Sequence, residues 1–227
     1  AGLGIFVGHR LSSKTRTLLT DVLGLATLLG AASALIPMWS SRYVDSLPAG
    51  WPLLVVLGSL IFGGLIGSAL GLEDRLDHLG ENLRKKFKAS KESPFVEGFV
   101  TASLLFAIGP LAILGSISDG MSNGIDQLLL KSTLDFFAAM AFASSLGWGV
   151  AVAAIPVALY QGFWTLIGLA LGEILDGYQV DAMTIVGGVL LIGIGLRLLN
   201  IKHVAVGNLL PALAIAPLLA MLVHSFI

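Results

Sequence analysis

The sequence contains no cysteine, and only 12% of its 227 residues are charged. Without cysteine the chain has no disulfide framework, no thiolate metal site and no cysteine nucleophile. The net charge of −1 gives no indication of a nucleic-acid partner. The sequence also lacks a His-Glu-x-x-His motif, a Gly-x-Ser-x-Gly motif and a Gly-Lys-Ser/Thr phosphate loop. We therefore expect neither an enzyme nor a protein that holds a metal or another cofactor.

Apolar residues dominate the composition instead. They make up 56% of the chain, and the mean hydropathy is +0.92, which is far above that of soluble domains. Because about 20 apolar residues in a helix cross a bilayer core of roughly 30 Å, runs of that length predict membrane spans. Seven such runs cover residues 19–38, 52–72, 96–117, 131–147, 150–172, 178–199 and 204–226. The predicted fold is an all-α, polytopic transmembrane helical bundle in a single domain, residues 1–227.

A truncated eighth apolar run stands at the start of the chain. Residues 1–7 are too short to cross a bilayer, and the sequence does not begin with Met. We therefore expect that N-terminal residues are missing, and the predicted number of spans is seven to eight.

Lysine and arginine are distributed unevenly among the connections between the runs. When alternate connections are placed on opposite sides, eleven basic residues fall on one side and only Arg42 and Lys131 on the other. Basic residues are enriched in cytoplasmic connections. This pattern predicts a plasma-membrane (inner-membrane) protein whose connections 9–18, 73–95 and 200–203 are cytoplasmic.

Residues 73–91, within the largest of these connections, form an amphipathic arm. From Leu72 to Phe87 the apolar residues recur at spacings of four and three, which is typical of a helix with one apolar face. Two interpretations stay open. The arm packs on the rest of the protein, or its basic end rests on anionic lipid.

A glycine pattern occurs twice, in the same order. Residues 24–30 match residues 187–193, and Gly4-x-x-x-Gly8 matches Gly168-x-x-x-Gly172. The first three helices and the last three helices lie five spans apart along the chain. Because five is an odd number, the two copies cross the membrane in opposite directions. Inverted repeats are typical of secondary transporters. We expect inverted three-helix repeats, helices 1–3 and 6–8, around a central pair formed by helices 4 and 5.

The central helices carry the polar groups that interrupt the apolar sequence. Gly109-Pro110 fall near the middle of helix 4, where the proline leaves the carbonyl of Phe106 without its helical donor. An orphan carbonyl inside a bilayer needs a donor or a cation. The segment is therefore either a broken helix with a binding role or a proline kink whose backbone groups are satisfied by neighbours. The candidate residues for binding a monovalent cation or small solute are Thr101, Ser103, Phe106, Gly109, Pro110, Asp135 and Gln161.

Two of these candidates also have a structural explanation. Asp135 stands in the first turn of helix 5, the run 131–147, where a carboxylate complements the helix dipole. Gln161 lies near mid-membrane, where an amide without a partner costs about 1–3 kcal/mol. It must therefore have a partner, and it either bridges two helices or lines an aqueous path.

Several of these segments together resemble a known family. They are residues 95–106, 109–120, 131–135, 142–147, 160–162, 186–195 and 208–213. They are similar to the bacterial inner-membrane family called domain of unknown function 554, the YqgA-like and YdfK-like membrane proteins. The resemblance covers essentially the whole chain and is weakest around residues 38–50. It implies a multi-helix plasma-membrane protein, with transport as one activity to consider, and it supplies no binding residues.

Two functions from different classes fit the sequence. The first is a small secondary transporter or ion-conducting protein for a cation or small solute, with its pathway near the broken helix 4 and helices 5 and 6. The second is a non-transporting membrane protein that recruits a partner or senses lipid through the arm 73–91. Both have the lipid bilayer as a partner, and the glycine-rich helix faces are compatible with a homo-oligomer.

Overall fold

The computed structural model describes residues 1–8, 12–90, 93–108, 110–122, 124–171 and 175–226, and the regular structure in these ranges is entirely helical. The elements are α1 (Gly2–Gly8), α2 (Ser13–Leu35), η1 (Ile36–Trp39), α3 (Ser41–Val44), α4 (Trp51–Leu70), α5 (Leu72–Lys86), α6 (Phe95–Ala107), α7 (Pro110–Gly120), α8 (Asp126–Leu146), α9 (Gly149–Val152), α10 (Ala154–Leu171), α11 (Gly177–Leu198), α12 (Val206–Leu209) and α13 (Pro211–His224). The predicted all-α fold is confirmed.

Seven candidate spans account for the seven predicted runs. Within the described ranges, six helical stretches are long and apolar enough to cross a membrane: Ser13–Trp39, Trp51–Leu70, Asp126–Leu146, Gly149–Ala170, Gly177–Leu198 and Val206–His224. The seventh consists of α6 and α7, which are bent by 61° relative to each other. The truncated eighth run forms α1, whose seven residues are far too few for a span.

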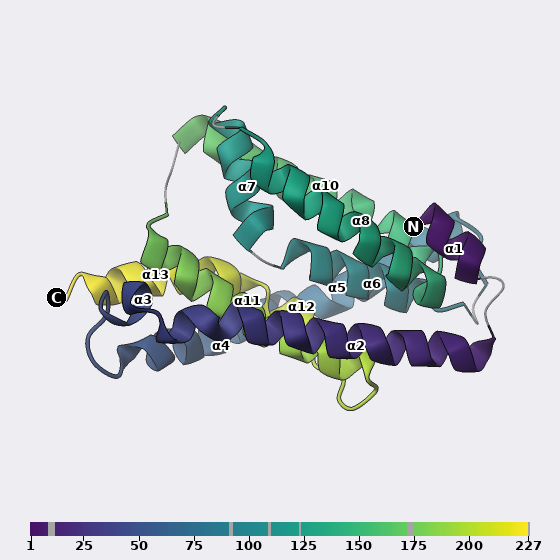
Figure 1. Cartoon of the computed structure of the whole chain (residues 1–227), viewed down its shortest axis with the longest axis horizontal. Helices are drawn as coiled ribbons and strands as arrows, with labels where there is room; N and C mark the ends of the chain where they lie inside the picture. Colours follow the sequence, from purple (N-terminus) through teal and green to yellow (C-terminus); the bar gives the residue numbers. More distant parts are fainter. Residues whose placement is uncertain (9–11, 91–92, 109, 123, 172–174, 227) are drawn as a thin grey trace.

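The helices form two groups (Figure 1). We call α2, α4, α11 and α13 the α11 group, since α11 packs extensively on α2 and on α13, while α4 packs on α13. We call α1, α6, α7, α8, α9 and α10 the α8 group, in which α1 packs on α8 and α10 packs on α7. The outward helix faces are apolar, with Leu29, Leu159 and Leu169 each more than 70% exposed. Such faces suit contact with lipid, so the fold is that of a multi-pass membrane protein.

The centre of the α11 group is α11 itself. Of the six continuous candidate spans it is the most buried, with 67% of its most apolar stretch inside the protein. Its buried face alternates large side chains such as Met183 and Leu190 with glycines. Gly188 and Gly195 of α11 lie directly against α2. Small residues allow helix backbones to approach closely, which is how helices associate in a membrane.

A buried carboxylate holds each end of α11. Near its start, the Asp181 side chain is 2% exposed and accepts hydrogen bonds from Nε of Arg42, at 2.7 Å, and from Nη2 of the same residue. The hydrogen bond to Asp181 raises the pKa of Arg42, so the guanidinium stays charged. Near the end of α11, Nη1 of Arg197 donates to Oε1 of Glu73 at 2.8 Å, and both side chains are at most 10% exposed. These two pairs fix α11 to the segments that follow α2 and α4.

The predicted amphipathic arm contains α5. Its Gly80 lies against Phe99 and Val96 of α6, and its Leu76 and Leu83 pack against the core. Arg84 is buried and donates to Oε2 of Glu81 and to the carbonyl of Ala89. The residues near the end of the arm, 91–92, lie outside the described residues. The apolar side of α5 is therefore used mainly in packing on the protein, in agreement with the first interpretation of this segment.

Candidate functional site

A pocket of about 370 Å³ lies where the two helix groups meet. We call it the central pocket. It is lined by Ser33 and Ala34 of α2, Leu105 and Phe106 of α6, Ile108 just after α6, Leu111 and Ala112 of α7, Lys131, Leu134 and Asp135 of α8, and Thr184 of α11. Most of this lining is apolar, with two hydroxyls and one pair of charges. A mainly apolar pocket with a few convergent polar groups is the usual form of a small-molecule site.

The charged residues of the central pocket are Lys131 and Asp135, which form an ion pair one helical turn apart on α8. The Lys131 side chain is 8% exposed and the Asp135 side chain 31%, so the carboxylate is the more accessible of the two. Nζ of Lys131 also stands 5.9 Å from the centroid of the Phe106 ring, a cation–π contact that joins α8 to the end of α6. Ionisable residues inside a span are costly, and they commonly mark a solute or proton pathway.

The helix bounds correct the expected position of both residues. Helix α8 begins at Asp126, five residues before the predicted start, so Asp135 lies in its third turn. The explanation of Asp135 by the helix dipole was therefore wrong, because that effect fades beyond the first turn. The sequence predicted Lys131 in an outer connection. In the structure it is instead buried inside the span.

The backbone of helix 4 is broken beside this pair. The α6 helix ends at Ala107, and Ile108 adopts an extended conformation with φ −77° and ψ 126°. Pro110 is the first residue of α7, a position where its missing N–H costs no helical hydrogen bond. The predicted Gly109 lies outside the described residues. An extended residue and a 61° change of direction indicate a broken helix rather than a proline kink.

The central pocket gathers only some of the predicted site residues. The side chains of Phe106 and Asp135 line it. On α6, Thr101 and Ser103 are buried but do not line it, and the Ser103 hydroxyl donates to the carbonyl of Phe99 at 2.6 Å. Gln161 on α10 is half-buried and also outside the pocket, and no hydrogen bond joins its side chain to another residue in the described ranges. Of the two roles considered for Gln161, the bridge between two helices is therefore not seen.

The Thr101 hydroxyl is buried, and it has no hydrogen-bond partner among the described residues. Because an unpaired buried hydroxyl costs about 1–3 kcal/mol, Thr101→Val should raise the free energy of unfolding in detergent by about 1 kcal/mol. Ser103→Ala is the matched control and should lower it by a similar amount, because that hydroxyl is paired. If Thr101→Val instead lowers stability or solute flux, the hydroxyl has a partner in the membrane-embedded protein.

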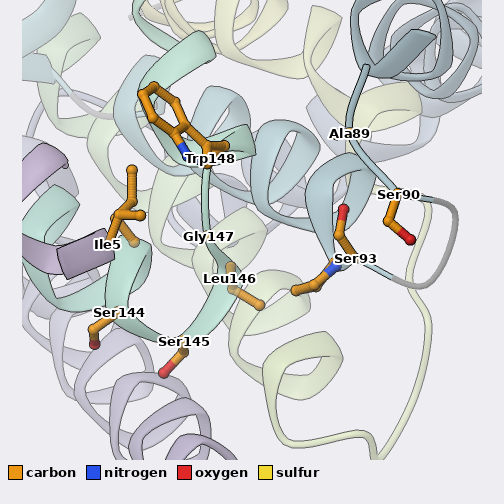
Figure 2. Close-up of a pocket in the computed structure, with 11 residues that line it drawn as sticks. Ile5, Ala89, Ser90, Ser93, Ser144, Ser145, Leu146, Gly147 and Trp148 are labelled. Carbon is orange, nitrogen blue, oxygen red and sulfur yellow. The ribbon is translucent and has the colours of Figure 1, made fainter. Parts of the chain in front are cut away.

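A second pocket, of about 230 Å³, lies between α1, the linker before α6 and the end of α8. Figure 2 shows Ser144 and Ser145 on one side of it, Ser90 and Ser93 on the other, and Trp148 above. The Ser144 hydroxyl donates to the carbonyl of Ala141 at 2.7 Å. None of the described residues that line it is charged. Its described wall is mainly apolar and is interrupted by the four serines.

A third pocket, of about 500 Å³, lies between the start of α6 and the α11–α12 connection. Val96 and Glu97 line it from α6, and Arg197, Lys202 and His203 line it from the other side, with Asn200 and Ile201 completing the lining. Its most buried cation, Arg197, is already bound by Glu73. The opposite charges of Glu97 and Lys202 leave no strong preference for either an anion or a cation.

Comparison with known proteins finds one matching family and two similar proteins. Residues 1–221 match the family described as "Protein of unknown function (DUF554)". Over 176 residues the chain is 35% identical to "Uncharacterized membrane protein YdfK" of Bacillus subtilis (strain 168), which covers 78% of this chain and 73% of that protein. Over 218 residues it is 33% identical to "Uncharacterized protein YqgA" of Escherichia coli (strain K12), which covers 94% and 88%. No solved structure matches the chain.

Proposed function

Since this chain belongs to the family described as "Protein of unknown function (DUF554)", a description that names no activity, we propose from its structure that it is a small secondary transporter. The observation that carries the proposal is the Lys131–Asp135 pair, placed inside a span and in a pocket beside a broken helix. Secondary transporters bind solutes near the middle of the membrane, where broken helices expose polar groups. The central pocket is the proposed binding site.

Lys131 changes which solute the site suits. The sequence predicted a monovalent cation or a small solute, with Asp135 as a single carboxylate among hydroxyls and carbonyls. The carboxylate is instead neutralised by the ammonium group beside it. A bare cation would have to displace Lys131 and leave its buried charge without a counter-ion, which is unfavourable in a medium of low polarity. We therefore favour a small solute over a bare cation.

The packing of the helices supports the proposed inverted repeat. The repeat pairs α2 with α11 and α4 with α13, and in the fold these counterparts pack on each other. It also equates Gly4 of α1 with Gly168 of α10. A Cβ at Gly4 would overlap the Met140 carbonyl on α8, and a Cβ at Gly168 would overlap the Ile117 carbonyl on α7. The equivalent helices therefore make equivalent close contacts with the two central helices, as an approximate two-fold axis requires.

We propose the plasma membrane as the location, with the basic connections 9–18, 73–95 and 200–203 in the cytoplasm. The burial of Lys131 removes it from the poorly charged side and leaves Arg42 as that side's basic residue. The third pocket brings the start of α6 next to residues 200–203, which supports placing these two connections on the same side. The role of the arm 73–91 in recruiting a partner or sensing lipid has less support, because much of its apolar face packs on the protein.

A flux experiment tests the transport proposal. Purified protein in liposomes should take up at least one solute from a panel of Na⁺, K⁺, H⁺, amino acids and lactate. Asp135→Asn should lower net uptake of that solute at least about tenfold, because it removes the exposed half of the charged pair. Asp126→Asn is the matched control at the first residue of the same helix and should leave uptake unchanged. Transport by this site is excluded if the inserted protein moves nothing from the panel, or if both variants behave alike.

A further inference from the structure

Resting on the proposed transport function, we infer that the central pocket binds one small monovalent anion together with one proton, so that transport is electroneutral. Lys131 would hold the anion and Asp135 the proton. The inference depends on the net charge of the site, the exposure of the two side chains and the chemistry of the pocket wall.

The net charge of the site decides which loaded states can cross the membrane. When the pocket is empty, the ammonium of Lys131 and the carboxylate of Asp135 cancel. A proton alone would leave a charge of +1, and an anion alone would leave −1. An uncompensated charge in a low-dielectric interior is strongly unfavourable. The empty site and the site holding both proton and anion are neutral, so only these two states can change sides at low cost.

The exposure of the two side chains gives the order of events. Asp135 is 31% exposed and lines the pocket, so a proton from water reaches it first. Protonation ends the ion pair: the carboxyl group becomes neutral and the Lys131 ammonium loses its counter-ion. The Phe106 ring remains next to this ammonium, with its centroid 5.9 Å from Nζ of Lys131. The anion then takes the place of the carboxylate as the counter-ion of Lys131, and the bond changes are limited to the proton that moves from hydronium in the water to the Asp135 carboxylate.

The wall of the pocket indicates the kind of anion. Leu105, Ile108, Leu111 and Leu134 provide an apolar surface, and Thr184 donates its hydroxyl to the Val180 carbonyl at 2.7 Å. A volume of about 370 Å³ admits a molecule of a few carbon atoms. A short carboxylate matches this wall, with its charged end at Lys131 and its apolar part against the leucines. A zwitterion of the same size fits less well, because Lys131 and Asp135 would both have to stay charged and separate from each other to meet its two ends.

Other ionisable groups on the surrounding helices lie away from the pocket lining. Among the described residues, α1 and α9 carry no ionisable side chain. Lys14 and Asp21 belong to the first turns of α2, Glu97 to the first turn of α6 and Asp119 to the end of α7. On α11, Asp181 is bound by Arg42. Of the titratable residues, Lys131 and Asp135 are those that line the pocket, so the proton is assigned to Asp135.

Lactate and alanine are suitable probes because they have the same carbon skeleton, but one is an anion and the other a zwitterion. In liposomes, an inward proton gradient of one pH unit should drive about tenfold accumulation of lactate, as expected for one proton per anion. A potassium diffusion potential set with valinomycin should not change lactate uptake. Alanine uptake should show no protein-dependent component. Protein-free liposomes measure passive entry of lactic acid.

Asp135→Asn provides the decisive variant. The neutral amide imitates the protonated carboxyl group, so this variant should still exchange external for internal lactate but should lose accumulation driven by the pH gradient. Retained exchange also shows that the variant is folded. Lys131→Met should lose both activities, and its elution as a single species in detergent checks its fold.

The possible outcomes separate the inference from the proposed function. Lactate uptake that responds to membrane potential and not to the proton gradient would overturn electroneutral coupling but leave transport intact. Alanine uptake that ignores pH would identify a zwitterion site and also overturn it. Asp135→Asn with full proton-driven accumulation would remove the role of Asp135. Absence of all protein-dependent flux would overturn the transport function itself.

Discussion

Replacing Glu73 with alanine should lower the free energy of unfolding by about 3–5 kcal/mol, the cost typical of removing one partner from a buried ion pair. The Glu73 carboxylate is 7% exposed and accepts from Nη1 of Arg197 at 2.8 Å and from the backbone N–H of Gly207 at 2.6 Å. Its own N–H donates to Oδ1 of Asn208 at 2.9 Å. The variant leaves the Arg197 charge buried without a partner and the Gly207 N–H unsatisfied. Unfolding in mixed detergent and SDS micelles, followed by circular dichroism, measures the loss.

Two further variants show whether the loss comes from the stranded charge. The double variant Glu73→Leu/Arg197→Met removes both charges and should recover most of the stability, because a well-packed apolar pair costs little relative to a buried ion pair. Asp74→Ala changes the neighbouring exposed carboxylate and should stay within about 0.5 kcal/mol of the original chain. Equal stability of Glu73→Ala and Asp74→Ala would show that the pair does not hold α5 to α11.

Gly67→Ala should be the most damaging of the single-methyl substitutions in the α11 group. A Cβ at Gly67 would overlap the carbonyl oxygen of Asn208, and the backbone carbon of Asn208 stands only 2.6 Å from it. Backbone atoms cannot rotate away as a side chain does, so α4 and α12 must separate. Overpacking typically costs about 1–3 kcal/mol, and the upper end is expected here. Unfolding in mixed detergent and SDS micelles, followed by circular dichroism, measures this loss of stability.

Gly30→Ala is the matched control for this substitution. Gly30 lies on α2, and a Cβ there would meet no atom within 4 Å. Alanine is favoured over glycine inside a helix by roughly 0.5–1 kcal/mol, so this control should be slightly stabilising. The two substitutions add the same methyl group and should therefore shift stability in opposite directions. A Gly67→Ala variant as stable as Gly30→Ala would mean that α4 and α12 are not in close contact.

The spans could be predicted from the sequence because each apolar run is long, local and bounded by polar residues. The run 178–199, for example, becomes the helix Gly177–Leu198. The break in helix 4 could also be anticipated, because proline acts on backbone groups within one turn of itself. Both features depend on neighbours in the sequence, so no knowledge of the folded chain is needed to see them.

The start of α8 was predicted wrongly because hydropathy counts a lysine as a reason to end a span. Lys131 and Asp135 are four residues apart, so a helix places them on one face, where they neutralise each other. That spacing is the signal in the sequence that places the pair inside the span. Reading the pair as one neutral unit would have extended the span and placed both residues together inside the membrane.

The residues that fix α11 gave no comparable local signal. Glu73 and Arg197 are 124 residues apart, and Arg42 and Asp181 are 139 apart. Glu73 looked like one of several acidic residues on the polar face of an amphipathic helix. Only the packing of α4, α11 and α12 brings its carboxylate to Arg197 and Gly207. Partners this distant are determined by tertiary structure, which a single sequence without an alignment does not display.

The two ion pairs of α11 also fix a length. Asp181 and Arg197 are separated by 16 residues along one continuous helix, which corresponds to about 24 Å at 1.5 Å per residue. Because both ends are tied to other segments, the helix cannot change its tilt independently to match a hydrocarbon layer of another thickness. Lipids with longer acyl chains must then thin locally around the protein, at a cost that rises with each ångström of mismatch. The protein therefore has a built-in preference for bilayer thickness, set by the spacing of its own charges.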